Sequence, residues 1–121
     1  MSKALAVLFP VYKREHLAQI SAKCLARIGT ELEPDGITMR VLIVGNEGWA
    51  HDMAEAYGWE YLNQSNQILG QKFDNGARWI VDNWGGTCSH FMEWGADNIT
   101  SRAFTELLRA RILGPQVHQI T

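Results

Sequence analysis

Apolar positions along the chain follow two different spacings, and each spacing predicts one kind of element. Residues 4–9 (ALAVLF) are apolar throughout, which is typical of a strand buried on both faces of a sheet. Residues 37–45 (ITMRVLIVG) are rich in β-branched side chains and also predict a strand. Shorter runs at 59–63 (WEYLN) and 88–94 (CSHFMEW) predict a third and a fourth strand.

Between these strands, and after the last one, apolar residues recur every three or four positions, as on one face of an amphipathic helix. The first helix is predicted over residues 14–28, and Gly29 is predicted to end it. Three further helices are predicted over residues 49–57, 70–84 and 100–112.

Strand and helix therefore alternate four times along the chain. This alternation predicts an α/β fold with right-handed crossovers: a Rossmann-like, mostly parallel sheet with helices on both faces. We find no repeat and no linker, so residues 1–121 are expected to form one domain. In such a sheet, ligands gather at the carboxyl ends of the strands, near the point where the strand order reverses.

Composition and charge narrow the classes of function. The chain has 121 residues, 46% of them hydrophobic and 20% charged, which is ordinary for a soluble domain. The formal net charge is -2 and the pI is about 6.0. This balance argues against a basic groove for nucleic acid, which needs clustered Lys and Arg.

Two features of the sequence bear on the cellular compartment of the protein. Cys24 and Cys88 show no metal-ligand or redox spacing, which favours two buried thiols in a reducing environment. The first ten residues (MSKALAVLFP) are too short an apolar run to span a membrane and lack a cleavage site for a signal peptide. We therefore expect a cytoplasmic protein without a membrane anchor.

Four segments at the ends of the predicted strands carry the candidate chemistry. They are FPVYKRE (9–15), IVGNEG (43–48), LGQKFDNG (69–76) and EWGADN (93–98). In this order they resemble four motifs of the family 2-like glycosyltransferases of the A-type fold. Those motifs are a Pro-Thr-Tyr-Asn-like turn, an Asp-Asp-Gly-Ser-like loop, a Leu-Gly-x-Lys-x-Asn-x-Gly segment and an Asp-x-Asp-like motif. The resemblance covers residues 4 to about 105, the nucleotide-sugar-binding half of that family.

The resemblance implies a truncated A-type fold that binds a nucleotide-diphosphate sugar and transfers the sugar to an unknown acceptor. Tyr12 would stack on the base, and Asn46 and Glu47 would contact the base or ribose. Lys72 would point at the diphosphate, helped by the helix N-terminus, and Gly76 would let the helix pack closely on the sheet. The residues implied for nucleotide-sugar binding are Pro10, Val11, Tyr12, Arg14, Asn46, Glu47, Gly70, Lys72 and Asp74.

Four of these residues have a plainer alternative role. Gly70 alternatively makes only a turn, and Lys72 is a solvated residue of the first helical turn. Tyr12 is alternatively a surface aromatic near a helix start, and Arg14 a solvated side chain. Gly45 stands where the family has its first acidic residue, so the resemblance assigns no particular base.

A divalent cation, Mn²⁺ or Mg²⁺, is the implied cofactor, because it would neutralise the diphosphate leaving group. Asp97 and Asn98 are the implied ligands, while Gly95 stands where the family has another acidic group. The alternative is that Asp97 or Asn98 caps the following helix. His90 and Glu93, three apart on a predicted strand, should point to opposite faces, which disfavours a metal pair.

Only 24 residues follow Asp97 (121 minus 97), where the family has its acceptor side. Three interpretations stay open: an enzyme with a minimal or borrowed acceptor side, a sugar-nucleotide-binding module without catalysis, and a protein-interaction module with the same fold. The alternating pattern of residues 117–120 suits an edge strand. We therefore expect a homo-oligomer or docking on a larger protein.

Overall fold

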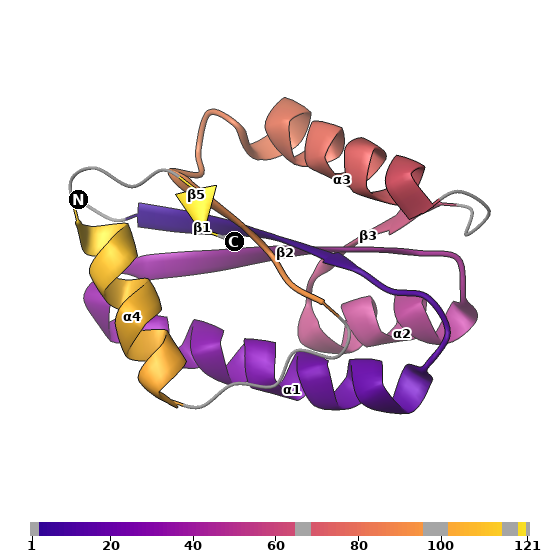
Figure 1. The fold of residues 1–121 in the computed structure, drawn as a ribbon, viewed down its shortest axis with the longest axis horizontal. Helices are drawn as coiled ribbons and strands as arrows, with labels where there is room; N and C mark the ends of the chain where they lie inside the picture. Colours follow the sequence, from indigo (N-terminus) through magenta and orange to yellow (C-terminus); the bar gives the residue numbers. More distant parts are fainter. Residues whose placement is uncertain (1–2, 65–68, 96–101, 115–118, 121) are drawn as a thin grey trace.

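The structure, a computed structural model, describes residues 3–64, 69–95, 102–114 and 119–120. Five strands form one sheet in the order β3-β2-β1-β4-β5, and every neighbouring pair is parallel (Figure 1). The predicted α/β fold with a parallel sheet is thus confirmed. The elements are β1 (Lys3–Pro10), α1 (Glu15–Leu32), a short 3-10 helix (Glu33–Asp35), β2 (Ile37–Gly45), α2 (Gly48–Tyr57), β3 (Glu60–Asn63), α3 (Leu69–Trp84), β4 (His90–Glu93), α4 (Arg102–Leu113) and β5 (Gln119–Ile120).

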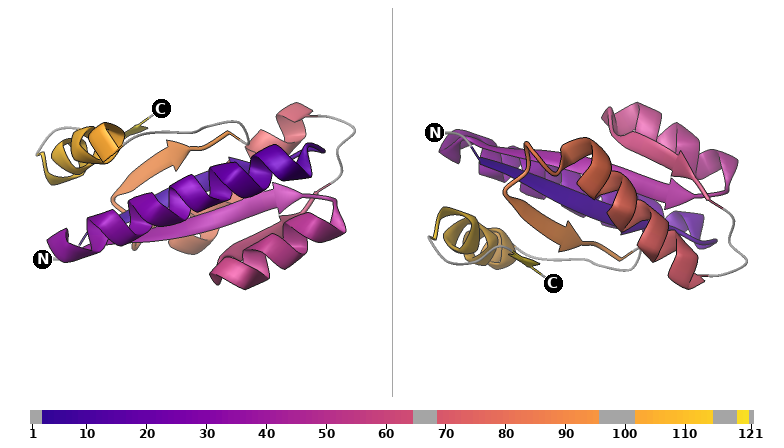
Figure 2. Two further views of the ribbon diagram at one scale, coloured as in Figure 1. Left: turned by 90° about the horizontal axis from the view of Figure 1, so that it is seen from below. Right: turned by 90° about the horizontal axis from the view of Figure 1, so that it is seen from above.

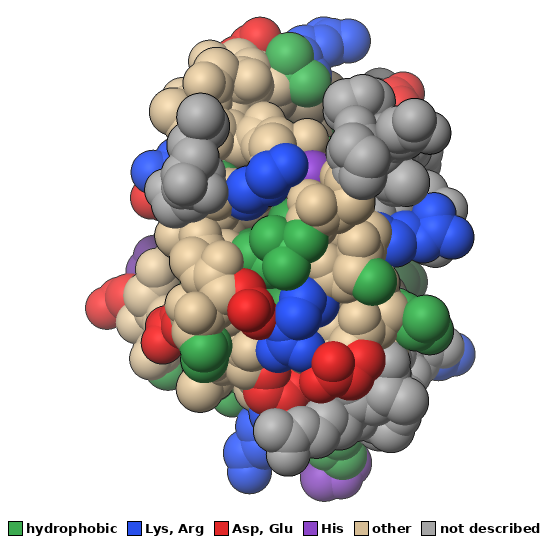
Figure 3. Space-filling view, turned by 90° about the vertical axis from the view of Figure 1, so that its left-hand side faces the viewer, with side chains coloured by type: hydrophobic (Ala, Val, Ile, Leu, Met, Phe, Trp, Pro, Cys, Tyr) green, Lys and Arg blue, Asp and Glu red, His purple; other side chains and the backbone are tan. Residues whose placement is uncertain are grey.

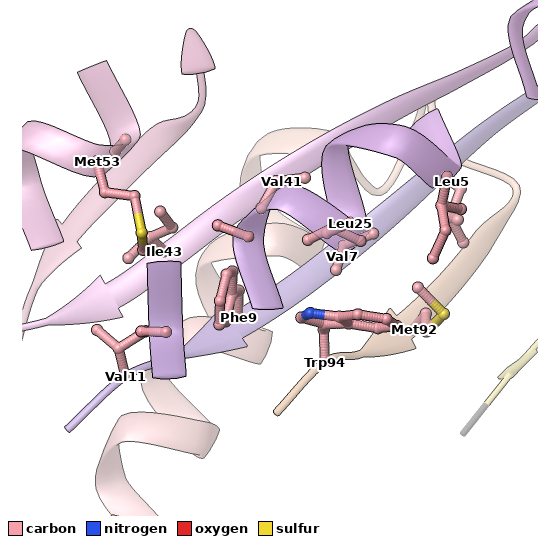
Figure 4. Packing of buried hydrophobic residues seen from close by; sticks show 14 of the residues in the cluster. Leu5, Val7, Phe9, Val11, Leu25, Val41, Ile43, Met53, Met92 and Trp94 are labelled. Carbon is pink, nitrogen blue, oxygen red and sulfur yellow. The ribbon is translucent and has the colours of Figure 1, made fainter. Parts of the chain in front are cut away.

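Helices cover both faces of the sheet, as predicted. α3 lies over one face, and α1, α2 and α4 lie on the side of the other face (Figures 1 and 2). Alternate side chains of β1 point to opposite faces of the sheet: Val7 and Phe9 pack under α1, whereas Leu8 packs under α3. Figure 4 shows part of the larger cluster, in which Leu25 of α1 lies over Val7. Hence β1 is buried on both faces, as its unbroken apolar run predicts.

The predicted end of α1 at Gly29 is wrong. The helix continues to Leu32 and ends in the 3-10 turn, with Gly36 in the left-handed conformation at φ 74°. A Cβ at Gly29 would lie 2.7 Å from the Cε of Met39, so this glycine allows close packing of α1 on β2. The fourth strand is also shorter than predicted, because the amide of Cys88 bonds to the carbonyl of Trp84 before the strand begins.

α3 approaches the sheet very closely at Gly76. A Cβ there would lie 2.5 Å from Leu8 Cδ1 and 3.0 Å from Val44 Cγ2. The prediction that this glycine permits close packing is confirmed. Because of this contact, the first turns of α3 come down onto the loops that follow β1 and β2.

The strand order reverses at β1. The chain adds β2 and β3 on one side of β1, and α3 then connects β3 to β4 on the other side of β1. α4 packs on α1 through Leu108 and Ile112, on the opposite side from α3. The β4–α4–β5 connection is therefore opposite in hand to the first two connections, which corrects the expectation of a uniform hand. The apolar face of α4 finds its partner on α1, and this contact decides the side.

The amino ends of the strands face the viewer in Figure 3, where basic and acidic side chains gather side by side. Arg109 of α4 donates to the carboxylate of Asp35, to the carbonyl of Glu31 at 2.8 Å, and lies 2.8 Å from a carboxylate oxygen of Glu106. This cluster fastens α4 to the end of α1.

None of the helices in the described ranges has the length and apolarity that a membrane crossing requires.

Candidate functional site

The loops after β1, β2 and β3 meet at one end of the sheet, opposite the Arg109 cluster. The amide of Val11 donates to the carbonyl of Val44 at 2.9 Å, so the chain after β1 stays beside β2. The amide of Gln64 donates to the carbonyl of Gly45 at 2.8 Å, which joins the segment after β3 to the same place. The first turns of α3 complete this end, which lies beside the reversal of the strand order, where α/β sheets bind ligands.

Lys72 is buried in the centre of this group, with 1% of its surface exposed. Its Nζ donates to the carbonyl oxygen of Val11 at 2.5 Å. Burial lowers the pKa of Lys72, and the negative charge of Glu47 acts in the opposite direction. The alternative of a solvated first-turn lysine is therefore wrong: a cation is held inside the protein beneath the loop after β1.

Tyr12 lies over this lysine at the surface, with 41% of its area exposed. The ammonium groups of Lys13 and Lys72 each lie 5.2 Å from the centre of its ring. Both are cation–π contacts, which hold the ring without hiding it. Stacking of Tyr12 on a base stays a prediction.

Glu47 ties the two loops together through its carboxylate. Oε2 accepts the backbone N–H of Lys13 at 2.5 Å, and Oε1 accepts the backbone N–H of Asn46 at 3.2 Å. The hydroxyl of Tyr61 donates to the carbonyl of Gly45 at 3.0 Å. Burial raises the pKa of Tyr61, and the charge of Glu47 raises it further. Glu47 is thus the carboxylate whose charge reaches both Lys72 and Tyr61.

The backbone of the loop after β1 is strained. Lys13 and Arg14 have φ values of 52° and 51°, and these are the non-glycine residues with positive φ among those described. Left-handed conformations cost a residue with a side chain about 1–3 kcal/mol and cluster where a ligand or a switch acts. Arg14 immediately precedes α1 and makes no capping bond with its side chain, which is exposed.

The remaining implied residues lie around this centre. Pro10 ends β1, Asn46 is exposed after β2, and Asp74 is exposed on α3, which also contains Gly70. Asp97 and Asn98, the implied metal ligands, lie outside the described residues.

The segment that leads toward Asp97 is anchored on α1. The indole N–H of the buried Trp94 donates to the hydroxyl oxygen of Ser21 at 2.7 Å, and this hydroxyl donates to the carbonyl of Gly95 at 2.9 Å. The amide of Trp94 bonds to the carbonyl of Leu8 at 2.8 Å. The carboxyl end of β4 is thus fixed beside that of β1.

The sequence did not point to Lys13 or to a cluster of possible metal ligands on α2. Lys13 stands between two selected residues, but its role depends on a backbone N–H that no residue pattern reveals. His51, Asp52 and Glu55 bring ligand atoms within 4.8 Å of one another on the exposed side of α2. The spacing of four between His51 and Glu55 on a predicted helix was the available signal.

Two other predictions concern β4 and the tail. His90 is buried with Nδ1 2.9 Å from the Ser89 hydroxyl, whereas Glu93 is exposed, so their opposite orientation is confirmed. Gln119 and Ile120 form the edge strand β5 beside β4, and residues 117–118 lie outside the described part of the chain.

Comparison with protein-family models, with curated proteins and with solved structures found no match to this chain.

Proposed function

We propose that the chain binds a nucleotide-diphosphate sugar at the carboxyl ends of β1 and β2 and, with a divalent cation, transfers the sugar to an acceptor. One observation carries the proposal: α3 buries the ammonium of Lys72 beneath the loop after β1, beside the reversal of the strand order. A buried charge is costly, and such groups concentrate at functional sites. Three of the four segments that resemble the A-type glycosyltransferases, residues 9–15, 43–48 and 69–76, lie at this end of the sheet.

Lys72 supplies positive charge to the diphosphate. An ammonium has three N–H donors, and the carbonyl of Val11 accepts one of them. The exposed side chains of Lys13 and Arg14 add charge at the surface of the same loop. Tyr12 offers an exposed ring at the position where the base would lie.

Asp97 and Asn98 would hold Mn²⁺ or Mg²⁺ in this proposal. One carboxylate and one amide are hard oxygen donors of the kind that these cations prefer, and the diphosphate oxygens would complete the coordination. The bond between Ser21 and Gly95 supports the assignment, because it anchors the backbone two residues before Asp97 at this end of the sheet. The cation would stabilise the charge of the leaving diphosphate.

A thermal-shift scan of sugar nucleotides with different bases, with and without Mn²⁺, tests the binding. A ligand at 100 times its Kd stabilises the folded state by about 2.7 kcal/mol, so a binding ligand is readily detected. Lys72→Met should weaken binding by about 1.5–3 kcal/mol, because it removes a charge-assisted bond. Tyr12→Ala should also weaken binding, whereas Glu60→Gln, an exposed change at the start of β3, should not.

Release of free nucleotide separates the possible outcomes. Release in the presence of the cation and an acceptor supports a transferase. Stabilisation without release would instead support the alternative, a sugar-nucleotide-binding module that lacks catalysis. A protein that is stabilised by no sugar nucleotide, or that binds equally well after both Lys72→Met and Tyr12→Ala, would refute the proposed site.

A further inference from the structure

The carboxylate of Glu47 lies in a position that suits an oxyanion. Its two oxygens accept backbone N–H groups from separate loops, Lys13 after β1 and Asn46 after β2, at 2.5 and 3.2 Å. Backbone N–H groups that converge in this way are a common means of binding phosphate oxygens. We refer to the amides of Lys13 and Asn46, together with the ammonium of Lys72, as the anion cradle.

The ammonium of Lys72 adds positive charge to the anion cradle. Lys72 is almost completely buried, and the charge of Glu47 acts on it. The carboxylate therefore interacts with the same cation that would attract a diphosphate. The N–H bonds to Glu47 lie at the surface, so another anion can reach them from solvent.

The loop conformation supports this interpretation. Lys13 and Arg14 both adopt left-handed backbone conformations, at φ 52° and 51°, while the N–H of Lys13 bonds to the carboxylate. Strain of this kind persists only where surrounding contacts enforce it. The contacts that hold this loop include the bond from Lys13 to Glu47 and the bond from Lys72 to Val11.

We propose that Glu47 is an internal competitor for the anion cradle: a phosphate or diphosphate group binds to the amides of Lys13 and Asn46 by displacing the Glu47 carboxylate. The inference rests on the proposed function for the identity of the whole ligand, but the competition itself concerns any phosphate group. It also changes the role of Glu47, which the family resemblance implies to be a contact to the base or ribose. A contact residue strengthens binding, whereas a competitor weakens it.

Inorganic pyrophosphate, titrated calorimetrically, is the direct probe. Glu47→Gln keeps the size of the side chain and removes its charge, so pyrophosphate should bind about tenfold more tightly than to the parent, the change expected when a competing charged hydrogen bond is lost. Glu60→Gln makes the same change in net charge at an exposed position and should leave the affinity nearly unchanged. Combining Glu47→Gln with Lys72→Met should remove the gain.

A second measurement covers the case in which these variants do not fold. In the parent, addition of pyrophosphate should shift the amide resonances of Lys13 and Asn46, because their hydrogen-bond acceptor changes. Unchanged amide resonances at saturating pyrophosphate, or a Glu47→Gln variant that binds pyrophosphate no more tightly than Glu60→Gln, would overturn the inference.

Failure of this inference is distinguishable from failure of the proposed function. If the parent binds sugar nucleotides but Glu47→Gln gains no affinity for pyrophosphate, Glu47 is not a competitor and the proposed function stands. If Glu47→Gln gains affinity for pyrophosphate while no sugar nucleotide binds, the competitor is supported and the proposed ligand is wrong.

Discussion

Replacing Gly76 with alanine tests the close approach of α3 to the sheet. The added Cβ would lie 2.5 Å from Leu8 Cδ1 and 3.0 Å from Val44 Cγ2. Carbon atoms in contact are normally about 3.5–4.0 Å apart, so the two surfaces must separate or repack. Leu8 and Val44 are both fully buried, so neither side chain can turn into solvent.

Two opposing terms set the size of the effect. Overpacking a dense core costs about 1–3 kcal/mol, whereas alanine stabilises a helix interior by about 1 kcal/mol relative to glycine. Gly76→Ala should therefore lower the free energy of unfolding by about 1 kcal/mol, and by at most about 2 kcal/mol. Gly48→Ala is the matched control, because a Cβ at this first residue of α2 meets nothing within 4 Å. This control should be neutral or slightly stabilising.

Urea denaturation of the parent and both variants measures the difference, provided that the m-values agree. Because Lys72 lies one turn before Gly76 on α3, a lifted helix should also weaken ligand binding. If Gly76→Ala proves as stable as Gly48→Ala, then α3 does not approach the sheet as closely as described, and the burial of Lys72 loses its cause.

Three further predictions concern contacts around the site and the opposite end of the sheet. Burial lowers the pKa of Lys72 from its ordinary value of 10.5. At a pH between the lowered pKa and 10.5, Lys72 is therefore more protonated in the unfolded chain than in the folded one. Urea titrations should therefore show the parent gaining stability relative to Lys72→Met as pH rises through that window, and a constant difference would contradict this. Ser21→Ala removes the hydroxyl that accepts from the Trp94 indole, and should lower the free energy of unfolding by about 1 kcal/mol; an unchanged urea midpoint would exclude a role for the bond. Arg109→Gln should lower the Tm more at low than at high ionic strength, because salt screens exposed charges, and an equal loss at both would exclude an electrostatic role.

The order and type of the elements could be predicted because they depend on local periodicity. The predicted helices over 49–57 and 70–84 agree closely with Gly48–Tyr57 and Leu69–Trp84. The end of α1 was predicted wrongly because a glycine was expected to end the helix, whereas Gly29 lies inside α1, facing the side chain of Met39. The side taken by α4 depends on its tertiary contact with α1.

The site could be predicted only as a set of loops. Parallel strands bring their carboxyl ends to one edge of the sheet, so the segments after β1 and β2 meet as expected. The burial of Lys72, however, follows from the close packing of α3, and the bonds of Glu47 go to backbone amides. Neither effect leaves a signature in residue types, so the sequence could indicate neither the burial of Lys72 nor the bond from the Lys13 amide to Glu47.

The most direct test of the proposed site is a map of amide chemical shifts during titration with the sugar nucleotide that stabilises the protein best, in the presence of Mn²⁺. We expect the largest changes at residues 11–14, 46–48 and 72–74, at the carboxyl ends of β1 and β2 and the start of α3. Little change is expected around Arg109, at the amino ends of the strands. Changes confined to that opposite end, or to the exposed side of α2, would contradict the proposed site.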